Sequence, residues 1–166
     1  MNPSIELPDT KNCFKFYELE QVYNIDKVIL KEKYLEKSKL YHPDFHTGDQ
    51  RLYQIAVSAS AFNNQAFKTL DNDISRASHL LELNQSESQE NAKLPQAFLM
   101  EMMELNEAID EINDDNRYDL EDQINAFKKS GKAEIAEFAI KLDWDNLRMA
   151  ILKWRYLERL ENRLSE

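Results

Sequence analysis

The 166-residue chain has few of the residues that make tight turns. It contains only two glycines, Gly48 and Gly131, and four prolines. All-β folds need many turns between short strands, so this composition favours an all-α fold. With 42% apolar and 31% charged residues, the chain has the ordinary composition of a globular protein that folds unaided.

Cysteine and long apolar segments are also scarce. Cys13 is the only cysteine, which excludes an intramolecular disulfide and a cysteine-built metal site and favours a reducing compartment. No apolar run approaches the roughly 18 residues that cross a bilayer. The first ten residues contain Glu6 and Asp9 but no arginine, unlike a targeting segment. We therefore expect a cytoplasmic protein without a membrane partner, with the mitochondrial matrix as the alternative.

Basic residues are outnumbered, since 21 Lys and Arg face 31 Asp and Glu, which gives a net charge of −10. The excess is uneven, because residues 11–84 carry ten charges of each sign whereas residues 85–166 carry eleven basic and nineteen acidic residues. Nucleic acid is a poor partner for such a chain, because phosphate binding needs a basic face. The asymmetry indicates two functional halves.

Helical patterns fill the first half. A short helix is predicted over 14–21, and a longer one runs from the N-cap Asp26 to about Tyr41. Turn residues at 47–49 precede a helix over about 50–70, and a further short helix lies near 74–81. The expected buried residues of these two longer helices are Leu30, Tyr34, Tyr41, Ala59, Phe62, Ala66, Phe67 and Leu70. The two longer helices should form an antiparallel hairpin with short flanking helices.

The second half reads as a three-helix bundle. A polar stretch at 85–94 is the expected linker, because 84–93 contain no apolar residue except Ala92. Helices follow from Pro95 to about Ile112 and from Trp144 to about Leu164. The helix between them is marked by Leu120, Ile124, Phe127, Phe138 and Leu142, with a possible kink at Gly131. The predicted division is a flexible leader 1–12, a first domain 13–84, the linker 85–94 and a second domain 95–166.

The loop of the predicted hairpin contains His42-Pro43-Asp44. Pro43 fixes its own φ and biases His42 toward an extended backbone, so the loop is stiff and presents an imidazole and a carboxylate. Rigid charged tips suit partner recognition. The plainer interpretation, in which Pro43 ends one helix and Asp44 or Thr47 helps to begin the next, explains the proline but not the His-Asp pair.

A metal-dependent hydrolase is an alternative hypothesis for the same loop. His42, Asp44 and His46 alternate, which places three donors on one side of an extended segment. Catalytic metal sites generally need further ligands and a base, and His79 is the only other histidine. The sequence therefore favours a docking function over catalysis.

The predicted helix after Pro95 has two distinct faces. At roughly 100° per residue, Phe98, Met102, Leu105 and Ile109 share one face, opposite Met100 and three glutamates. One face must be core, and the other exposes methionine, an adaptable binding residue, beside carboxylates that suit a basic partner. From periodicity alone, a merely solvated face is an equally good interpretation.

The last predicted helix is also apolar on two sides. Leu147, Ile151 and Trp154 form one stripe, and the other consists of Met149, Leu152, Tyr156 and Leu160. Such a helix is either central in the bundle or supplies an interface. Without further information, Tyr156 fits the core better than a surface contact.

These motifs carry a family resemblance. The segment from Tyr34 through Asp44, followed by Phe62-Asn63, Ala66-Phe67 and Leu70-Asp71, resembles a J-domain, whose signature is His-Pro-Asp. J-domains dock on DnaK-type ATP-driven chaperones and stimulate their ATPase. Residues 97–111 look like the first helix of the C-terminal domain of HscB-type co-chaperones, which serve iron–sulfur cluster assembly. The segments Arg76-Ala77, Leu80-Leu81 and Arg155-Tyr156-Leu157 also resemble that family.

The resemblance implies an all-α protein with an N-terminal J-domain and a C-terminal three-helix domain that binds an IscU-type scaffold protein. The protein would then be a regulator of an HscA- or DnaK-type chaperone and not an enzyme, with no cofactor and no metal. The candidate chaperone-binding residues are Lys31, Lys39, His42, Pro43 and Asp44. The candidate scaffold-binding residues are Leu99, Met100, Met103, Glu104, Glu107, Glu111 and Tyr156.

The residues around the tripeptide include both basic and apolar side chains. Lys31, Lys33, Lys37 and Lys39 suit electrostatic steering, but Glu32 and Glu36 dilute the run, and such lysines usually serve solubility. J-domains commonly continue with Lys or Arg after the tripeptide, whereas this chain has Phe45-His46, which removes a local basic contact. The remaining alternative is a helical adaptor that binds an unrelated partner through its acidic half.

Overall fold

The computed structural model describes residues 11–84, 93–113 and 115–165, and these residues contain helices and no strand. The all-α prediction is therefore confirmed. The chain divides into two compact units, Met1–Leu83 and Asn84–Glu166. The predicted leader 1–12 and linker 85–94 fall largely outside the described residues, so those domain limits stay predictions.

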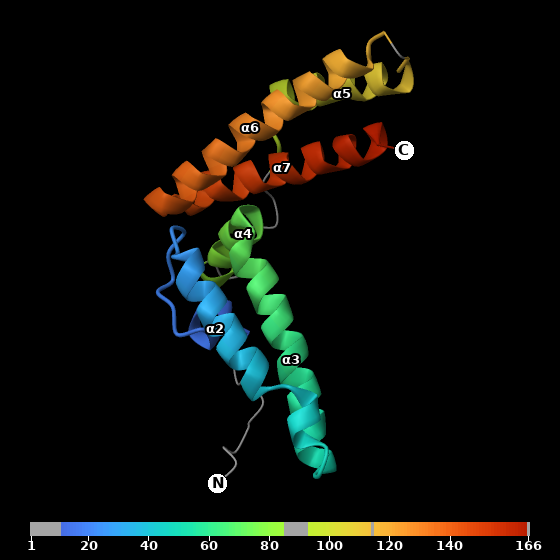
Figure 1. The fold of residues 1–166 in the computed structure, drawn as a ribbon. Coiled ribbons are helices and arrows are strands. Elements are labelled where there is room, and N and C mark those ends of the chain that lie inside the picture. Colours follow the sequence, from blue (N-terminus) through green and yellow to red (C-terminus); the bar gives the residue numbers. More distant parts are fainter. Residues whose placement is uncertain (1–10, 85–92, 114, 166) are drawn as a thin grey trace. The chain divides into compact units, whose positions relative to one another are not determined.

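The first unit is built on a helical hairpin. Its elements are α1 (Cys13–Phe16), α2 (Lys27–Leu40), the 3-10 turn η1 (Pro43–His46), α3 (Gln50–Asp71) and α4 (Asp73–Asn84). Figure 1 shows α2 and α3 side by side and antiparallel, with the His-Pro-Asp turn at their junction.

Aspartate caps fix where the two hairpin helices begin. Asp26 accepts hydrogen bonds from the backbone N–H groups of Val28 at 2.8 Å and Ile29 at 3.2 Å. Asp49 does the same for Arg51 at 2.8 Å and Leu52 at 3.1 Å. Each side chain satisfies donors that the first helical turn leaves unpaired, which is why both helices start where the sequence predicts.

The core of the first unit lies between α1, α2 and α3. Phe14, Tyr17 and Leu30 are fully buried, as are the small residues of α3 and its last leucine, namely Ala56, Ala59, Ala66 and Leu70. The small α3 side chains leave room for aromatic rings, and the Phe62 ring meets Phe16 edge-on at 4.9 Å between centroids. The expected apolar edge of α3 is confirmed, with Phe62 and Phe67 half-buried.

The first helix is shorter than the predicted 14–21. It ends at Phe16, because Glu18 adopts a left-handed backbone with φ 53°. The N–H of Leu19 then bonds to the Phe14 carbonyl at 2.9 Å, and the N–H of Glu18 bonds to the Lys15 carbonyl at 3.1 Å. This paired termination closes a helix and turns the chain away.

Arg76 ties α4 to the rest of the unit. Its side chain is 4% exposed and donates to the carbonyls of Tyr23 at 2.7 Å and Leu70 at 2.5 Å. It also pairs with Asp73 at 2.8 Å and lies over the Tyr23 ring. A buried guanidinium with this many partners fixes the start of α4 against the end of α3.

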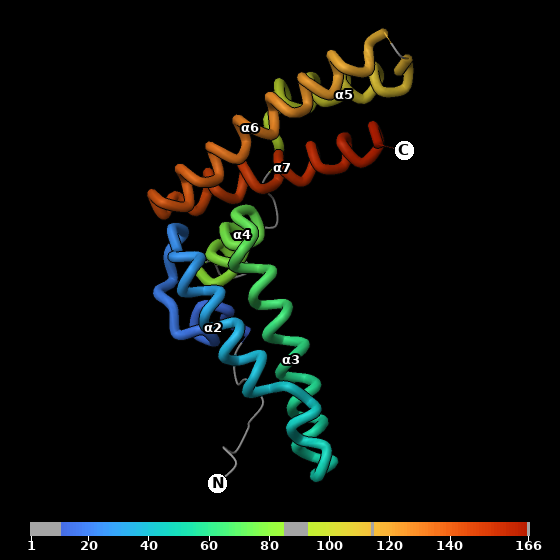
Figure 2. The backbone as a smooth tube through the Cα atoms, in the orientation of Figure 1, coloured from blue at the N-terminus to red at the C-terminus, as the bar shows by residue number. Residues whose placement is uncertain are grey.

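The second unit consists of α5 (Gln96–Asp110), α6 (Arg117–Lys141) and α7 (Trp144–Leu164). Figure 2 shows α6 and α7 joined by a short turn, near which they lie side by side, and separating toward their other ends. The core that includes α5 is formed by Met102, Leu105, Ile109, Leu120, Ile124, Leu157, Leu160 and Leu164. Ion pairs join the helices outside this core, from Arg163 to Asp110 and from Lys128 to Glu161.

Three details of the bundle differ from the sequence pattern. Helix α6 runs unbroken through Gly131, so the glycine does not introduce the kink that the sequence suggests. Leu142 is not part of its buried face, because it ends the helix in a left-handed conformation with φ 57° and is 56% exposed. Leu160, which the sequence pattern groups with Met149 and Leu152, is 3% exposed and belongs to the core, and the half-buried Tyr156 packs against that core.

Candidate functional site

The His-Pro-Asp tripeptide forms a short hydrogen-bonded turn between α2 and α3. His42 has the extended backbone that a following proline imposes, with φ −69° and ψ 121°. Its Nδ1 accepts a hydrogen bond from the Asp44 backbone N–H at 3.3 Å, and the Asp44 carboxylate lies 3.8 Å from the same nitrogen. Both side chains face solvent, with 52% of His42 and 82% of Asp44 exposed.

Further hydrogen bonds hold this turn in one conformation. The Phe45 N–H donates to the His42 carbonyl at 3.1 Å, and the Asp49 N–H donates to the His46 carbonyl at 3.3 Å. His46 Nε2 lies 3.1 Å from the Leu40 carbonyl oxygen, which can only accept, so this nitrogen carries the proton. The sequence prediction of a stiff turn that presents an imidazole and a carboxylate matches this geometry.

The same geometry removes the basis of the metal hypothesis. That hypothesis needs an extended segment in which His42, Asp44 and His46 point to one side. Pro43–His46 form a 3-10 turn instead, and the His46 ring is directed to the Leu40 carbonyl. Within the described parts of the chain, no group of three or more His, Cys, Asp and Glu side chains is placed to hold a metal ion.

Four of the five lysines of α2 separate into two pairs. Lys33 forms an ion pair with Glu18 at 3.2 Å, which lowers the pKa of that carboxyl group, and Lys37 lies 4.7 Å from the centroid of the Phe16 ring. These two lysines therefore brace α1 against α2. Lys31 and Lys39 are exposed, and no ion pair joins them to other described residues, so they are the lysines available to a partner.

The outer face of α5 carries the second set of candidate residues. Its apolar members are exposed, at 36% for Leu99, 56% for Met100 and 59% for Met103. Glu104, Glu107 and Glu111 are exposed as well. The opposite face is core, with Met102 fully buried and Leu105 and Ile109 each 6% exposed. The two-faced pattern predicted for this helix is the one the structure has.

Tyr156 lies at the seam between α7 and α5. Its half-buried ring meets the Phe98 ring edge-on, with 6.1 Å between centroids and an interplanar angle of 81°. The guanidinium of Arg159 lies 5.1 Å from the centre of the same ring. Because Phe98 directly precedes Leu99, this contact places Tyr156 beside the α5 segment that bears the exposed apolar residues. Tyr156 thus supports the core and reaches the surface.

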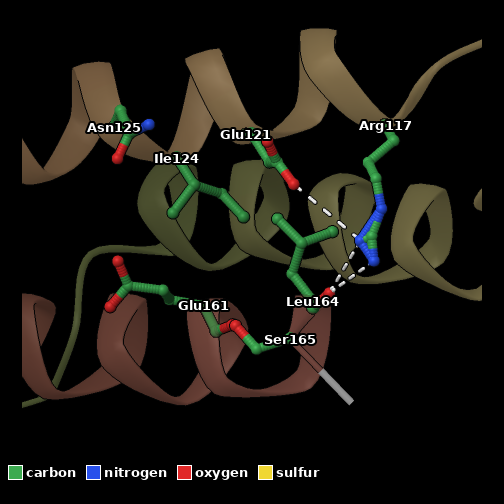
Figure 3. A pocket seen from close by; sticks show the side chains of 7 residues that line it. All are labelled: Arg117, Glu121, Ile124, Asn125, Glu161, Leu164 and Ser165. Atoms are coloured by element: carbon green, nitrogen blue, oxygen red, sulfur yellow. Dashed lines mark hydrogen bonds and ion pairs between the residues drawn. The ribbon is translucent and has the colours of Figure 1, made fainter.

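A separate cavity of about 320 Å³ lies where α6 begins and α7 ends, and Figure 3 shows its lining. The Arg117 guanidinium donates to the Leu164 carbonyl at 3.4 and 3.2 Å and lies 3.8 Å from the Glu121 carboxylate. A cation at the C-terminal end of a helix satisfies a carbonyl that has no helical partner. The polar groups of this cavity secure a helix end, and none belongs to either candidate set.

Comparisons with known proteins place the chain among the HscB co-chaperones. Residues 94–165 match the family model described as the HSCB C-terminal oligomerisation domain. The co-chaperone protein HscB homolog of Photobacterium profundum is 30% identical over 157 residues, which cover 90% of this chain and 92% of that protein. The co-chaperone protein HscB homolog of Shewanella pealeana is 32% identical over 165 residues, with 93% and 95% covered.

Two solved structures have the same fold. The crystal structure of human co-chaperone protein HscB matches with a TM-score of 0.85 at 24% identity, covering 98% of this chain and 85% of that one. Chaperone HscB from Vibrio cholerae matches with a TM-score of 0.76 at 26% identity, covering 93% and 95%.

An exposed His-Pro-Asp turn in a helical hairpin, together with a separate three-helix unit, defines a J-domain protein with an added helical domain. The chain belongs to the HscB family of co-chaperones. As a member of this family, the chain is a co-chaperone. In the described residues, no helix is both long and apolar enough to span a bilayer.

Proposed function

We propose that the chain binds an IscU-type scaffold protein through its second unit and stimulates an HscA- or DnaK-type chaperone through its first. It has no catalytic activity of its own in this proposal, because ATP hydrolysis takes place on the partner. The main support for this proposal is the rigid, exposed His-Pro-Asp turn in a member of a co-chaperone family. The HscB relatives from Photobacterium and Shewanella favour a bacterial protein, and its proposed compartment is the cytoplasm.

The first unit would act by differential binding. A regulator shifts a two-state partner only when it binds one state more tightly than the other. His42, Pro43 and Asp44 would contact the chaperone's nucleotide-binding lobe and linker in the state that is competent for hydrolysis. The turn is suited to this contact because it is already ordered by internal hydrogen bonds, so little conformational entropy is lost on binding.

The second unit would hold the scaffold on the outer face of α5. Leu99, Met100 and Met103 offer exposed apolar surface, and methionine adapts to irregular partner surfaces. The flanking glutamates, Glu104 and Glu107 among them, would meet basic residues of the scaffold and orient it. Carrying both sites on one chain raises the concentration of the scaffold at the chaperone.

Asp44→Asn tests the first half of this proposal. The substitution removes a charge that is 82% exposed, and the fold should be unaffected because Asp44 contributes its side chain to no core contact. We expect it to abolish stimulation of the cognate chaperone's ATPase in single-turnover measurements while scaffold binding is retained. Equal stimulation by wild type and variant would refute the docking model and favour an adaptor with an unrelated partner.

The triple variant Leu99→Ala, Met103→Ala and Tyr156→Ala tests the second half. We expect it to weaken binding to a purified IscU-type scaffold at least tenfold, because a few apolar anchors of an interface carry much of its affinity. The matched control is Ile140→Ala with Leu142→Ala, which removes apolar side chains of 54% and 56% exposure elsewhere in the same unit. Circular dichroism confirms folding, and unchanged affinity of the triple variant would mean that this face is only solvated.

A further inference from the structure

Phe45 stands out among the side chains that the co-chaperone function leaves unexplained. It is 69% exposed, which makes it the most exposed large apolar side chain among the described residues of the first unit. It lies in η1, directly after Asp44, at the tip of the α2–α3 hairpin, where turns normally carry polar residues. An exposed ring at this place adds nothing to the core, so its effect must be sought at the surface.

The structure holds this ring in a defined place. The Phe45 backbone N–H is bonded to the His42 carbonyl, and the two rings lie 5.4 Å apart with an interplanar angle of 52°. A partner that touches the exposed imidazole of His42 therefore also meets the Phe45 ring. Because a phenylalanine has only two side-chain torsions and this one already rests against His42, fixing it in an interface costs little entropy.

The charges of the tip indicate the chemistry of the opposing surface. The tip exposes the Asp44 carboxylate and, beside it, an apolar ring, with no Lys or Arg among residues 42–49. An acidic partner surface would repel Asp44, whereas an apolar depression with a cation at its edge would accept both groups. The tip is therefore complementary to an apolar and basic surface.

We propose that Phe45 is a specificity-determining contact that inserts its ring into an apolar depression on the ATP-driven chaperone, next to the surface that receives His42 and Asp44. The inference rests on the proposed function and adds to it a rule for partner choice. A chaperone that presents an acidic surface at this point would bind this chain weakly, because the ring would displace water from carboxylates without replacing their hydrogen bonds.

The test uses the full chain and a purified DnaK-type chaperone that the wild type stimulates. ATPase rate is measured against co-chaperone concentration for Phe45→Ala, Phe45→Leu and Phe45→Lys. We expect Phe45→Ala to raise the half-maximal concentration about tenfold with the maximal rate unchanged, as for loss of one well-packed interface side chain. Phe45→Leu should stay within about twofold of wild type, and Phe45→Lys should be at least as impaired as Phe45→Ala.

Tyr118→Ala is the matched control, since it removes an aromatic side chain of 76% exposure from the second unit. It should leave the titration unchanged, and all four variants should melt at the wild-type temperature because the substituted rings are exposed. A Phe45→Ala variant with wild-type half-maximal concentration would overturn the proposal, as would Phe45→Lys with full potency. A lower maximal rate at unchanged half-maximal concentration would also overturn it, by showing that Phe45 only positions His42.

These outcomes are separable from failure of the proposed function. If Asp44→Asn abolishes stimulation while the Phe45 variants behave as wild type, the docking model stands and the contact is refuted. If Asp44→Asn stimulates normally, the docking model itself falls, and the proposal about Phe45 falls with it.

Discussion

Buried polar side chains fix how the helices of the first unit pack against one another. Asn63 is 1% exposed, and its amide donates to the Tyr34 carbonyl at 3.2 Å and to Ser38 at 2.9 Å. Its side-chain oxygen lies 2.7 Å from the Tyr17 hydroxyl, and burial raises the pKa of that phenol. One asparagine thereby joins α2, α3 and the end of α1, and a buried amide without these partners would be costly.

His79 makes a comparable contact that responds to pH. Its Nε2 accepts a hydrogen bond from the Cys13 backbone N–H at 3.0 Å, which requires that nitrogen to be unprotonated. Burial lowers the pKa of His79 below its usual value, although the nearby Glu82 carboxylate partly opposes this. The unfolded chain takes up a proton near pH 6.5 that the folded chain resists, so the free energy of unfolding should fall as the pH drops below about 6.5.

The measurement is urea unfolding between about pH 7.5 and 5.5, with His79→Gln as the reference. The loss of stability in this window has a slope of at most about 1.4 kcal/mol per pH unit from one histidine. Glutamine can still accept the Cys13 N–H through its side-chain oxygen but does not titrate, so the variant should lack this part of the slope. Parallel pH profiles for both proteins would contradict the assignment.

The hydrogen-bond partners of buried polar side chains such as Asn63 and His79 cannot be predicted from a sequence pattern. The spacing of apolar residues predicts which face of α3 is buried, and Ala59, Ala66 and Leu70 are buried as expected. It does not predict that a polar residue shares that face, because the groups that satisfy Asn63 and His79 lie between 25 and 66 residues away in the chain. Only the assembled helices bring donor and acceptor together.

At the scale of the elements, helix starts were predictable and two helix ends were not. Asp26 and Asp49 cap α2 and α3, as the sequence indicates, because a side-chain carboxylate is a strong local signal. The chain turns away from α1 at Glu18 and from α6 at Leu142, which adopt left-handed backbones without being glycine. That conformation is uncommon for such residues, so no local signal announces it.

Gly131 lies inside α6 and leads to a prediction about helix stability. A Cβ added there would lie 3.6 Å from Trp154 Cε3 and 4.0 Å from Leu157 Cδ1, which are ordinary contact distances. Glycine in a helix interior is less favourable than alanine by about 0.5–1 kcal/mol. Gly131→Ala should therefore raise the free energy of unfolding by about that amount.

Chemical denaturation of the full chain measures this change. The reverse substitution in the same helix, Ala133→Gly, is the matched control. Because Ala133 is exposed, this variant should lower the free energy of unfolding by a similar amount. A destabilised Gly131→Ala variant would show that α7 tolerates no side chain at this point of α6, and that the glycine is needed for helix packing.

At the scale of the whole molecule, both candidate sites lie on surfaces that the sequence already marks. The His-Pro-Asp turn and the outer face of α5 are short, local patterns, and the exposure of Asp44, Met100 and Met103 agrees with them. The position of Tyr156 beside α5 cannot be predicted from the local sequence. Its contact with Phe98 depends on how α5 packs on α7, which no single helix pattern contains.

In the proposed mechanism, one molecule binds the scaffold and the chaperone at the same time. Asp44→Asn should still bind the scaffold, and the triple variant at Leu99, Met103 and Tyr156 should still engage the chaperone. If tethering drives delivery, an equimolar mixture of these two full-length variants should fail to restore the scaffold-dependent part of ATPase stimulation, because neither chain brings scaffold and chaperone together.

The control for that mixture is wild-type protein at half the total concentration, with the same amounts of scaffold and chaperone. We expect it to retain most of the scaffold-dependent stimulation when the protein is in excess of its binding constants. Raising the scaffold concentration should bring the activity of the mixture closer to that of the wild type. At high concentration, free scaffold reaches the chaperone as often as tethered scaffold does. Full activity of the mixture at low scaffold concentration would show that the two units act independently and that their covalent connection is not needed for delivery.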